Sequence, residues 1–203
     1  MKQLLTLIIV CTTIQIGIAQ EAYFSVGKNF TTYNYTNSLG VSNANVSPGS
    51  GNYYEVGYVL TLDKQFSIGS AVTLNEYNAT GGNSLNNYSW DTNYLGFQEV
   101  FKYTAYEDND YSIKLNAGLN LNHIINGQQK INGQTIDLTK EKEFRGIFMQ
   151  GILGIEASYL VQRYIALGIC YNYSRSTNLS NGSDQKVNFS NSQLQFNIIM
   201  PLQ

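Results

Sequence analysis

The stretch that decides the fold is Tyr111-Ser-Ile-Lys-Leu-Asn-Ala-Gly-Leu-Asn-Leu-Asn122. Its odd positions are apolar or aromatic, and its even positions are polar or glycine. Successive side chains of a β-strand point to opposite faces, so this alternation predicts a strand with one apolar and one polar face. The stretch is about twice the usual strand length of about 5–6 residues, and it matches the ~9–11 tilted residues with which a strand crosses a bilayer. It therefore predicts one strand of a membrane β-barrel.

Seven other segments repeat this pattern with varying regularity. They lie at about Tyr23–Tyr35, Tyr53–Leu62, Phe66–Asn75, Tyr88–Tyr106, Arg145–Leu160, Ile165–Ser174 and Gln193–Leu202. The connections between the eight predicted strands alternate long and short, beginning and ending with a long one. Short turns at one end and long loops at the other are typical of outer-membrane barrels. The predicted fold class is all-β: a closed antiparallel up-and-down transmembrane β-barrel of eight strands.

Two local patterns modify this plan. Glu99 shares its parity with the apolar residues Phe97 and Phe101, so we expect a β-bulge that shifts the register within Tyr88–Tyr106, at a position that the sequence does not define. The connection after the opening stretch contains Asn126-Gly127 and Asn132-Gly133. Asn-Gly is the preferred centre of a type I′ hairpin, so this connection is expected to form a small projecting β-ribbon.

Residues 1–19 have the pattern of a secretory signal peptide, with Lys2, an apolar stretch from Leu4 and the small-x-small sequence Gly17-Ile18-Ala19. The mature barrel domain is therefore predicted to comprise residues 20–203. Cys170 is its only cysteine, so no intramolecular disulfide is expected. The formal net charge of the chain is −2, which leaves no basic field that would attract nucleic acid.

The polar face of the strands is predicted to fill the barrel, because eight strands leave an interior just wide enough for side chains. Buried charges are costly unless they are paired, so we expect a polar network in the lumen in which Lys114 shares partners such as Glu55 and Glu156. Its predicted members are Glu55, Lys114, Asn116, Asn120 and Glu156, with Lys102 as a further candidate. Tyrosines near strand ends are predicted to form two interfacial girdles. These are Tyr53, Tyr54, Tyr103, Tyr106, Tyr111, Tyr159, Tyr171 and Tyr173.

Together, the Gly17-Ile18-Ala19 ending, the eight alternating segments and the alternating apolar residues of the last strand resemble the small outer-membrane β-barrel family of Gram-negative bacteria, especially a Bacteroidota-like branch. The resemblance implies location in the bacterial outer membrane after export through a cleaved signal peptide. It also implies outer-membrane lipid and lipopolysaccharide as partners, and the barrel-assembly machinery, which recognises the last strand. It names no extracellular partner. The chain departs from the family pattern in its last residues, Met200-Pro201-Leu202-Gln203, which lack the usual terminal aromatic residue.

Some similar barrels are lipid-modifying enzymes, which need a serine, an oriented base and a carboxylate. The single histidine, His123, has no Asp or Ser beside it, so it is expected at the rim and no catalytic set is predicted. The acidic run from Glu107 to Asp110 lacks the spacing of a calcium loop, and no cofactor or metal site is predicted. Basic residues in or beside the last two long loops could meet lipopolysaccharide phosphates: Lys130, Lys140, Lys142, Arg145, Arg175 and Lys186.

The leading hypothesis is a non-enzymatic outer-membrane barrel with a structural or interaction role, which displays four extracellular loops. One alternative is a narrow pore or a conduit for small apolar solutes. Another is a soluble periplasmic or secreted carrier, in which the apolar face of each strand would line the interior. An enzyme that acts on outer-leaflet lipid is a more distant alternative.

Overall fold

The computed structural model describes residues 20–36, 39–40, 46–82, 87–179 and 186–202. The predicted signal peptide, residues 1–19, lies outside the described residues. The strands are β1 Glu21–Thr36, β2 Val46–Thr61, β3 Phe66–Glu76, β4 Ala79–Gly82, β5 Asn87–Glu107, β6 Tyr111–Ile131, β7 Gln134–Asp137, β8 Ile147–Gln162, β9 Ile165–Asn178 and β10 Lys186–Pro201. Over the described residues, no helix has the length and apolar character needed to cross a membrane.

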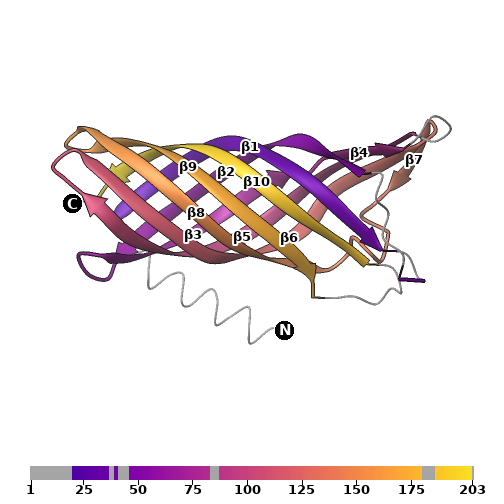
Figure 1. The fold of residues 1–203 in the computed structure, drawn as a ribbon, viewed down its shortest axis with the longest axis horizontal. Helices are drawn as coiled ribbons and strands as arrows, with labels where there is room; N and C mark the ends of the chain where they lie inside the picture. The colour runs from indigo at the N-terminus through magenta and orange to yellow at the C-terminus, as the bar shows by residue number, and fades with distance from the viewer. Residues whose placement is uncertain (1–19, 37–38, 41–45, 83–86, 180–185, 203) are drawn as a thin grey trace.

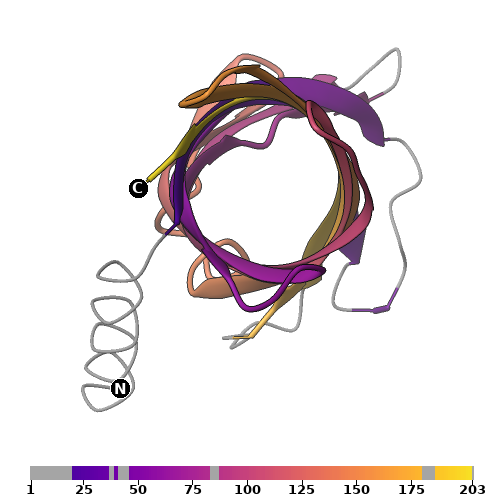
Figure 2. The same cartoon turned by 90° about the vertical axis from the view of Figure 1, so that its left-hand side faces the viewer.

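Eight of these strands close into a ring (Figures 1 and 2). Its order is β1, β2, β3, β5, β6, β8, β9 and β10, and β10 pairs antiparallel with β1 along the whole of β1. Paired residues traced once around the ring lead from Ala22 back to Thr32, ten residues further along β1. This stagger tilts the strands relative to the barrel axis, as closure of the sheet requires. The predicted fold class is confirmed.

The two remaining strands extend one end of the barrel, which we call the long-loop end (Figure 1). β4 follows β3 after Tyr77 and Asn78 and pairs with both β2 and β5. β7 pairs with the end of β6 around Asn132 and Gly133, whose φ angles of 49° and 87° suit a type I′ turn. The predicted projecting ribbon is confirmed, and it turns at Asn132-Gly133, whereas Asn126-Gly127 lies within β6.

The opposite end carries the short connections β2–β3, β5–β6 and β8–β9, and we call it the short-turn end. Both described ends of the chain meet there, where the Leu202 amide donates to the Gln20 carbonyl (2.6 Å). At the long-loop end several strands are longer than predicted: β2 begins at Val46, β6 continues to Ile131 and β10 begins at Lys186. These extensions were missed because they lie beyond the apolar belt, where both faces of a strand can be polar and no alternation marks them.

The apolar face of the strands points outward. On β6, Leu115 and Leu119 are 46% and 51% exposed, whereas Asn120 is 2% exposed. The same exposed belt continues around the ring through Phe24, Val56, Val72, Phe101, Leu153, Ile169 and Phe196. A soluble carrier needs the reverse arrangement, so that alternative is wrong.

The predicted tyrosine girdles are largely outward-facing, with one correction. Tyr54, Tyr106, Tyr111, Tyr159, Tyr171 and Tyr173 are exposed and Tyr103 is partly exposed. Tyr53 is 1% exposed and lies inside the barrel, so its assignment to a girdle was wrong. Adjacent residues of a strand point to opposite faces, so Tyr53 and Tyr54 cannot both meet lipid.

The expected bulge does not displace Glu99 from the outward face. The register between β5 and β6 shifts between Asn93 and Tyr94 and again between Thr104 and Tyr106, on either side of Glu99. Glu99 therefore keeps the parity of the apolar belt and accepts a hydrogen bond from the Ser70 hydroxyl (2.7 Å). The predicted shift of register in this strand is therefore present, but it leaves Glu99 on the outward face.

Candidate functional site

The inward-facing side chains fill the barrel in three successive zones. β5 shows the order from the short-turn end to the long-loop end, since it contributes Lys102, then Gln98, then Tyr94, all buried. We call the three levels the charged zone, the amide zone and the aromatic zone. Every zone is built by side chains from several strands, so closure of the ring is what brings their members together.

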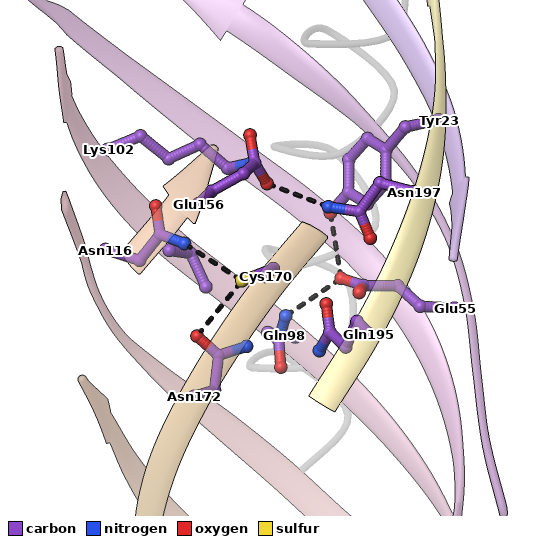
Figure 3. A pocket seen from close by; sticks show the side chains of 11 residues that line it. Tyr23, Glu55, Gln98, Lys102, Asn116, Glu156, Cys170, Asn172, Gln195 and Asn197 are labelled. Atoms are coloured by element: carbon purple, nitrogen blue, oxygen red, sulfur yellow. Dashed lines mark hydrogen bonds and ion pairs between the residues drawn. The ribbon is translucent and has the colours of Figure 1, made fainter. Parts of the chain in front are cut away.

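The charged zone contains two carboxylates and one lysine (Figure 3). Lys102 Nζ lies 3.1 Å from Glu156 Oε2, and Asn197 Nδ2 donates to the same oxygen (3.0 Å). Glu55 accepts hydrogen bonds from Tyr23 Oη (2.9 Å), Tyr53 Oη (2.8 Å) and Gln98 Nε2 (2.8 Å). Both carboxylates are 3% exposed, so these bonds replace water that Glu55 and Glu156 Oε2 lose on folding.

The structure places the five predicted network residues on the inner face. Asn116 Nδ2 donates to Cys170 Sγ (3.5 Å), and Asn120 Nδ2 donates to Thr73 Oγ1 (3.2 Å). Lys114 lies opposite Glu156 in the β6–β8 register, yet its ion pair is with Glu21 Oε2 near the short-turn mouth (3.9 Å).

Among the described contacts, Lys114 therefore has its ion pair with Glu21, although its charge also acts on Glu156 from the facing position. Lys102 and Asn197 already occupy Glu156 Oε2, and Lys102 reaches it from a strand that is not adjacent to β8. Sequence reasoning also missed the contributions of Tyr23 and Tyr53, which donate to Glu55. Tyr23 has the same inward parity as Ser25 on β1, and Tyr53 has the same inward parity as Glu55 on β2. This parity could have identified both tyrosines as interior residues.

The amide zone is held by side chains that both donate and accept. Asn29 Oδ1 accepts from Asn191 Nδ2 (2.9 Å) and Gln193 Nε2 (2.8 Å). On the opposite side, Gln150 Oε1 accepts from Asn122 Nδ2 (2.8 Å) and from Tyr77 Oη (2.8 Å), which links this zone to the next. These bonds cross-link strands β1, β10, β6, β8 and the segment after β3.

The aromatic zone fills the long-loop end of the interior. Its tightest ring pair is Tyr77 and Phe189, with centroids 4.5 Å apart. Its buried members are Tyr33, Tyr77, Ala79, Trp90, Tyr94, Ile124, Leu138, Phe144, Phe148, Val187 and Phe189. This apolar cluster was not predicted, because the same residue types on neighbouring positions form the outer belt.

The connection from β7 to β8 closes over the aromatic zone. Leu138 and Phe144 insert into it and are 0% and 6% exposed. The backbone is anchored at both ends, since the Leu138 amide donates to the Gly127 carbonyl (2.9 Å) and Asn178 Nδ2 donates to the Glu143 carbonyl (3.0 Å). The ring interior at this end is therefore occupied by side chains from the barrel wall and from the connection.

Within the charged zone lies a cavity of about 20 Å³, lined by Tyr23, Glu55, Gln98, Val100, Lys102, Asn116, Glu156, Cys170, Asn172, Gln195 and Asn197 (Figure 3). This is room for about one water-sized particle. His123, the predicted rim residue, is exposed on the outer face, and its Nδ1 lies 2.9 Å from the Gly146 carbonyl oxygen. Among the described residues, no group of three His, Cys, Asp or Glu side chains is placed to hold a metal ion.

An outward apolar belt, a ring of tilted antiparallel strands and a filled polar interior define a transmembrane β-barrel of eight strands. Neither the available protein family models nor the curated protein sequences match this chain.

Solved structures do resemble it. The outer membrane protein OprG from Pseudomonas aeruginosa aligns with a TM-score of 0.52 at 10% identity, over 91% of this chain and 97% of that one. The outer membrane protease OmpT from Escherichia coli aligns with a TM-score of 0.48 at 10% identity, over 91% and 97% of the two chains. Neisserial surface protein A aligns with a TM-score of 0.45 at 16% identity, over 88% and 97%. At such identities the likeness to OprG supports the fold alone.

Proposed function

We propose that this chain is a non-enzymatic barrel of a Gram-negative outer membrane, with a structural or interaction role performed by its long-loop end. The observation that carries the proposal is the aromatic zone, which fills the interior at that end with rings that have no exposed surface, such as Tyr94 and Phe148. A barrel whose bore is filled acts through its outer surface and its ends. The Bacteroidota-like origin and the cleavage of residues 1–19 stay predictions.

The long-loop end offers a folded surface for such a role. β5 and β6 are each 21 residues long, roughly twice the ~9–11 residues that a bilayer requires, so both continue well beyond the belt. The β6–β7 ribbon projects at this end, and the connection behind it is fixed by Leu138 and Phe144. A preorganised surface of this kind binds a partner with less ordering cost than a mobile loop.

Lipid and lipopolysaccharide are the proposed immediate partners. The outward apolar belt matches acyl chains, and basic side chains beyond it could pair with phosphates. Exposed candidates are Lys130, Lys140, Lys142, Arg145 and Arg175, while the side chain of Lys186 lies outside the described residues. The barrel-assembly machinery, which would recognise β10 during biogenesis, is the remaining proposed partner.

Conductance across a planar bilayer tests whether the bore is used. We expect no unit steps from the purified, refolded protein. A variant that combines Phe148→Ala with Phe189→Ala, which removes two rings from the aromatic zone, should raise the leak current. Regular conductance steps from the unaltered protein would instead support the narrow-pore alternative.

Surface labelling in cells tests the membrane and the orientation. Asn132→Cys lies at the tip of the ribbon and Asn109→Cys in a short turn, while the native Cys170 is 2% exposed and gives little background. In intact cells, a membrane-impermeant maleimide should label Asn132→Cys and leave Asn109→Cys unlabelled until the outer membrane is permeabilised. The reverse pattern would place the ribbon in the periplasm and contradict the proposal.

A further inference from the structure

The charged zone has more hydrogen-bond acceptors than donors. Across the described part of the chain, the buried side-chain atoms without a hydrogen-bond partner are all oxygens. Three of them belong to residues that line the cavity in Figure 3: Glu156 Oε1, Asn116 Oδ1 and Asn197 Oδ1. Buried polar atoms are normally paired, because the low-dielectric interior makes an unpaired one costly. The cavity is therefore suited to a particle that donates hydrogen bonds or carries positive charge.

The charge of the lining distinguishes between these two possibilities. The lining contains the carboxylates Glu55 and Glu156 and one ammonium group, that of Lys102. Three donor groups, Tyr23 Oη, Tyr53 Oη and Gln98 Nε2, converge on the Glu55 carboxylate, and such an arrangement favours its ionised form. The lining thus carries a formal charge of −1, and a buried charge without compensation is unfavourable. A water molecule would supply donors, but only a cation would supply the missing charge as well.

Size and ligand chemistry narrow the occupant further. The cavity of about 20 Å³ admits one water-sized particle, so an ion must shed its hydration shell to enter. Carboxylate and amide oxygens are the ligands that hard cations prefer in proteins. A single positive charge is enough to neutralise the lining, which favours a monovalent ion.

The short-turn end is the side from which a cation would reach this cavity. A second cavity of about 140 Å³ lies at that mouth, and its lining includes Glu21, Glu107, Asp108 and Asp110 against one lysine, Lys114. Clefts lined by one sign of charge raise the local concentration of the opposite ion. Along β6 and β10, the mouth residues Lys114 and Ile199 are followed on the inner face by Asn116 and Asn197 of the inner cavity.

We infer that the charged zone binds one small monovalent cation, of the size of sodium or potassium, taken up from the short-turn end. Glu156 Oε1 is its charged ligand, and the side-chain oxygens of Asn116 and Asn197 are its neutral ligands. Lys102 remains on the other carboxylate oxygen of Glu156. The ion thereby completes an interior network that the protein side chains leave short of positive charge.

Thermal unfolding at constant pH and ionic strength tests this inference. The refolded barrel in detergent is compared in sodium, potassium or N-methyl-D-glucamine chloride, the last of which is too large for the cavity. We expect a saturable rise in the midpoint of unfolding with sodium or potassium, and none with N-methyl-D-glucamine. Glu156→Gln should abolish the rise, whereas Glu141→Gln, which removes an exposed carboxylate from the β7–β8 connection, should keep it.

A second variant changes the charge in the other direction. Lys102→Met makes the lining more negative, so its midpoint should be lower in N-methyl-D-glucamine and should rise further on addition of the small cation than in the unaltered protein. The comparison stays decisive even where Glu156→Gln does not fold. Equal midpoints in all three salts, or a rise that Lys102→Met fails to enlarge, would show that the cavity holds water and would overturn the inference. Stabilisation by calcium alone would also overturn it.

Discussion

Lys102 on β5 and Glu156 on β8 form an ion pair across the barrel interior, with Nζ and Oε2 3.1 Å apart, although β6 lies between their strands. Their side chains are 8% and 3% exposed. The two residues are 54 positions apart, so the pair forms only when β5, β6 and β8 are assembled in register. It is therefore a product of the tertiary structure and a sensitive place to perturb it.

Removal of one partner of this pair should destabilise the barrel strongly. Lys102→Met leaves the Glu156 carboxylate buried without the Lys102 ammonium group, and such a change typically lowers the free energy of unfolding by about 3–5 kcal/mol. The double variant Lys102→Met with Glu156→Gln should recover part of that loss, because the stranded charge is gone. Urea unfolding in detergent micelles with N-methyl-D-glucamine as the buffer cation measures both. A double variant less stable than Lys102→Met would contradict this account.

Replacement of Glu99, on the outer face, should have the opposite effect and stabilise the barrel. Along β5 it lies between the outward residues Phe97 and Phe101, in the middle of the apolar belt. A charged side chain is unfavourable at this depth, by less for Glu than for Lys or Arg. Even with the hydrogen bond from Ser70 lost, Glu99→Leu should raise the free energy of unfolding by about 1 kcal/mol.

A matched control for Glu99 lies on the neighbouring strand. Glu76 is also on the outward face of the ring, at the end of β3 that faces the long loops, and its Oε2 accepts hydrogen bonds from Asn52 N and Asn52 Nδ2 (both 2.9 Å). Glu76→Leu should lower stability by about 1 kcal/mol because these bonds are lost. If urea unfolding showed that both variants change the free energy of unfolding in the same direction, the placement of Glu99 within the apolar belt would be wrong.

The packing of the interior predicts contrasting effects for two glycines on β8. A Cβ atom at Gly154 would overlap Asn172 Oδ1 and approach the Tyr171 carbonyl oxygen to 2.7 Å, whereas a Cβ at Gly151 would meet nothing within 4 Å. Gly154→Ala should therefore cost about 1–3 kcal/mol, as other overpacking changes do. Gly151→Ala should be neutral or slightly stabilising. Heat-induced unfolding followed by gel mobility distinguishes them, and equal midpoints would be inconsistent with this packing.

The β7–β8 connection should show a local dependence on pH. Asp137 Oδ1 accepts hydrogen bonds from the Thr139 hydroxyl (2.6 Å) and amide (3.0 Å), and Lys140 Nζ lies 3.1 Å from Oδ2. The Thr139 hydrogen bonds and the Lys140 ion pair lower the pKa of Asp137 below its ordinary value. Because the folded-state pKa is lowered, the ionised Asp137 carboxylate stabilises the turn at pH values above the ordinary pKa of Asp. This stabilisation is lost as the pH falls through the lowered pKa.

Titration of the Asp137 carboxyl by NMR checks this expectation. Thr139→Val should bring its pKa back toward the ordinary value for Asp of about 3.9, because the hydroxyl donor is lost. A pKa in the unaltered protein at or above that value would contradict the described hydrogen bonds.

Much of the architecture was predictable because each strand carries its own information. The alternation from Tyr111 to Asn122 identified the outward face, and the two Asn-Gly pairs identified the ribbon without deciding which of them forms its turn. Glu55 and Glu156 were correctly placed inside, since parity alone decides that. The ion pair of Lys114 with Glu21 was not predicted, because it depends on which side chains converge across the ring. The place of Tyr53 was predicted wrongly, because it was inferred from its nearness to a strand end.

The sequence by itself determined which residues of this protein meet lipid and which face inward, because a period of two is a local property of an extended chain. Only the tertiary structure decided that Lys102 pairs with Glu156, that Tyr77 and Phe189 pack together in the aromatic zone, and that three residues with unpaired oxygens line one small cavity. These contacts join strands distant in sequence, and the stagger of the closed ring sets which levels coincide. Alternation records the face of a residue and carries no information about its height along the barrel.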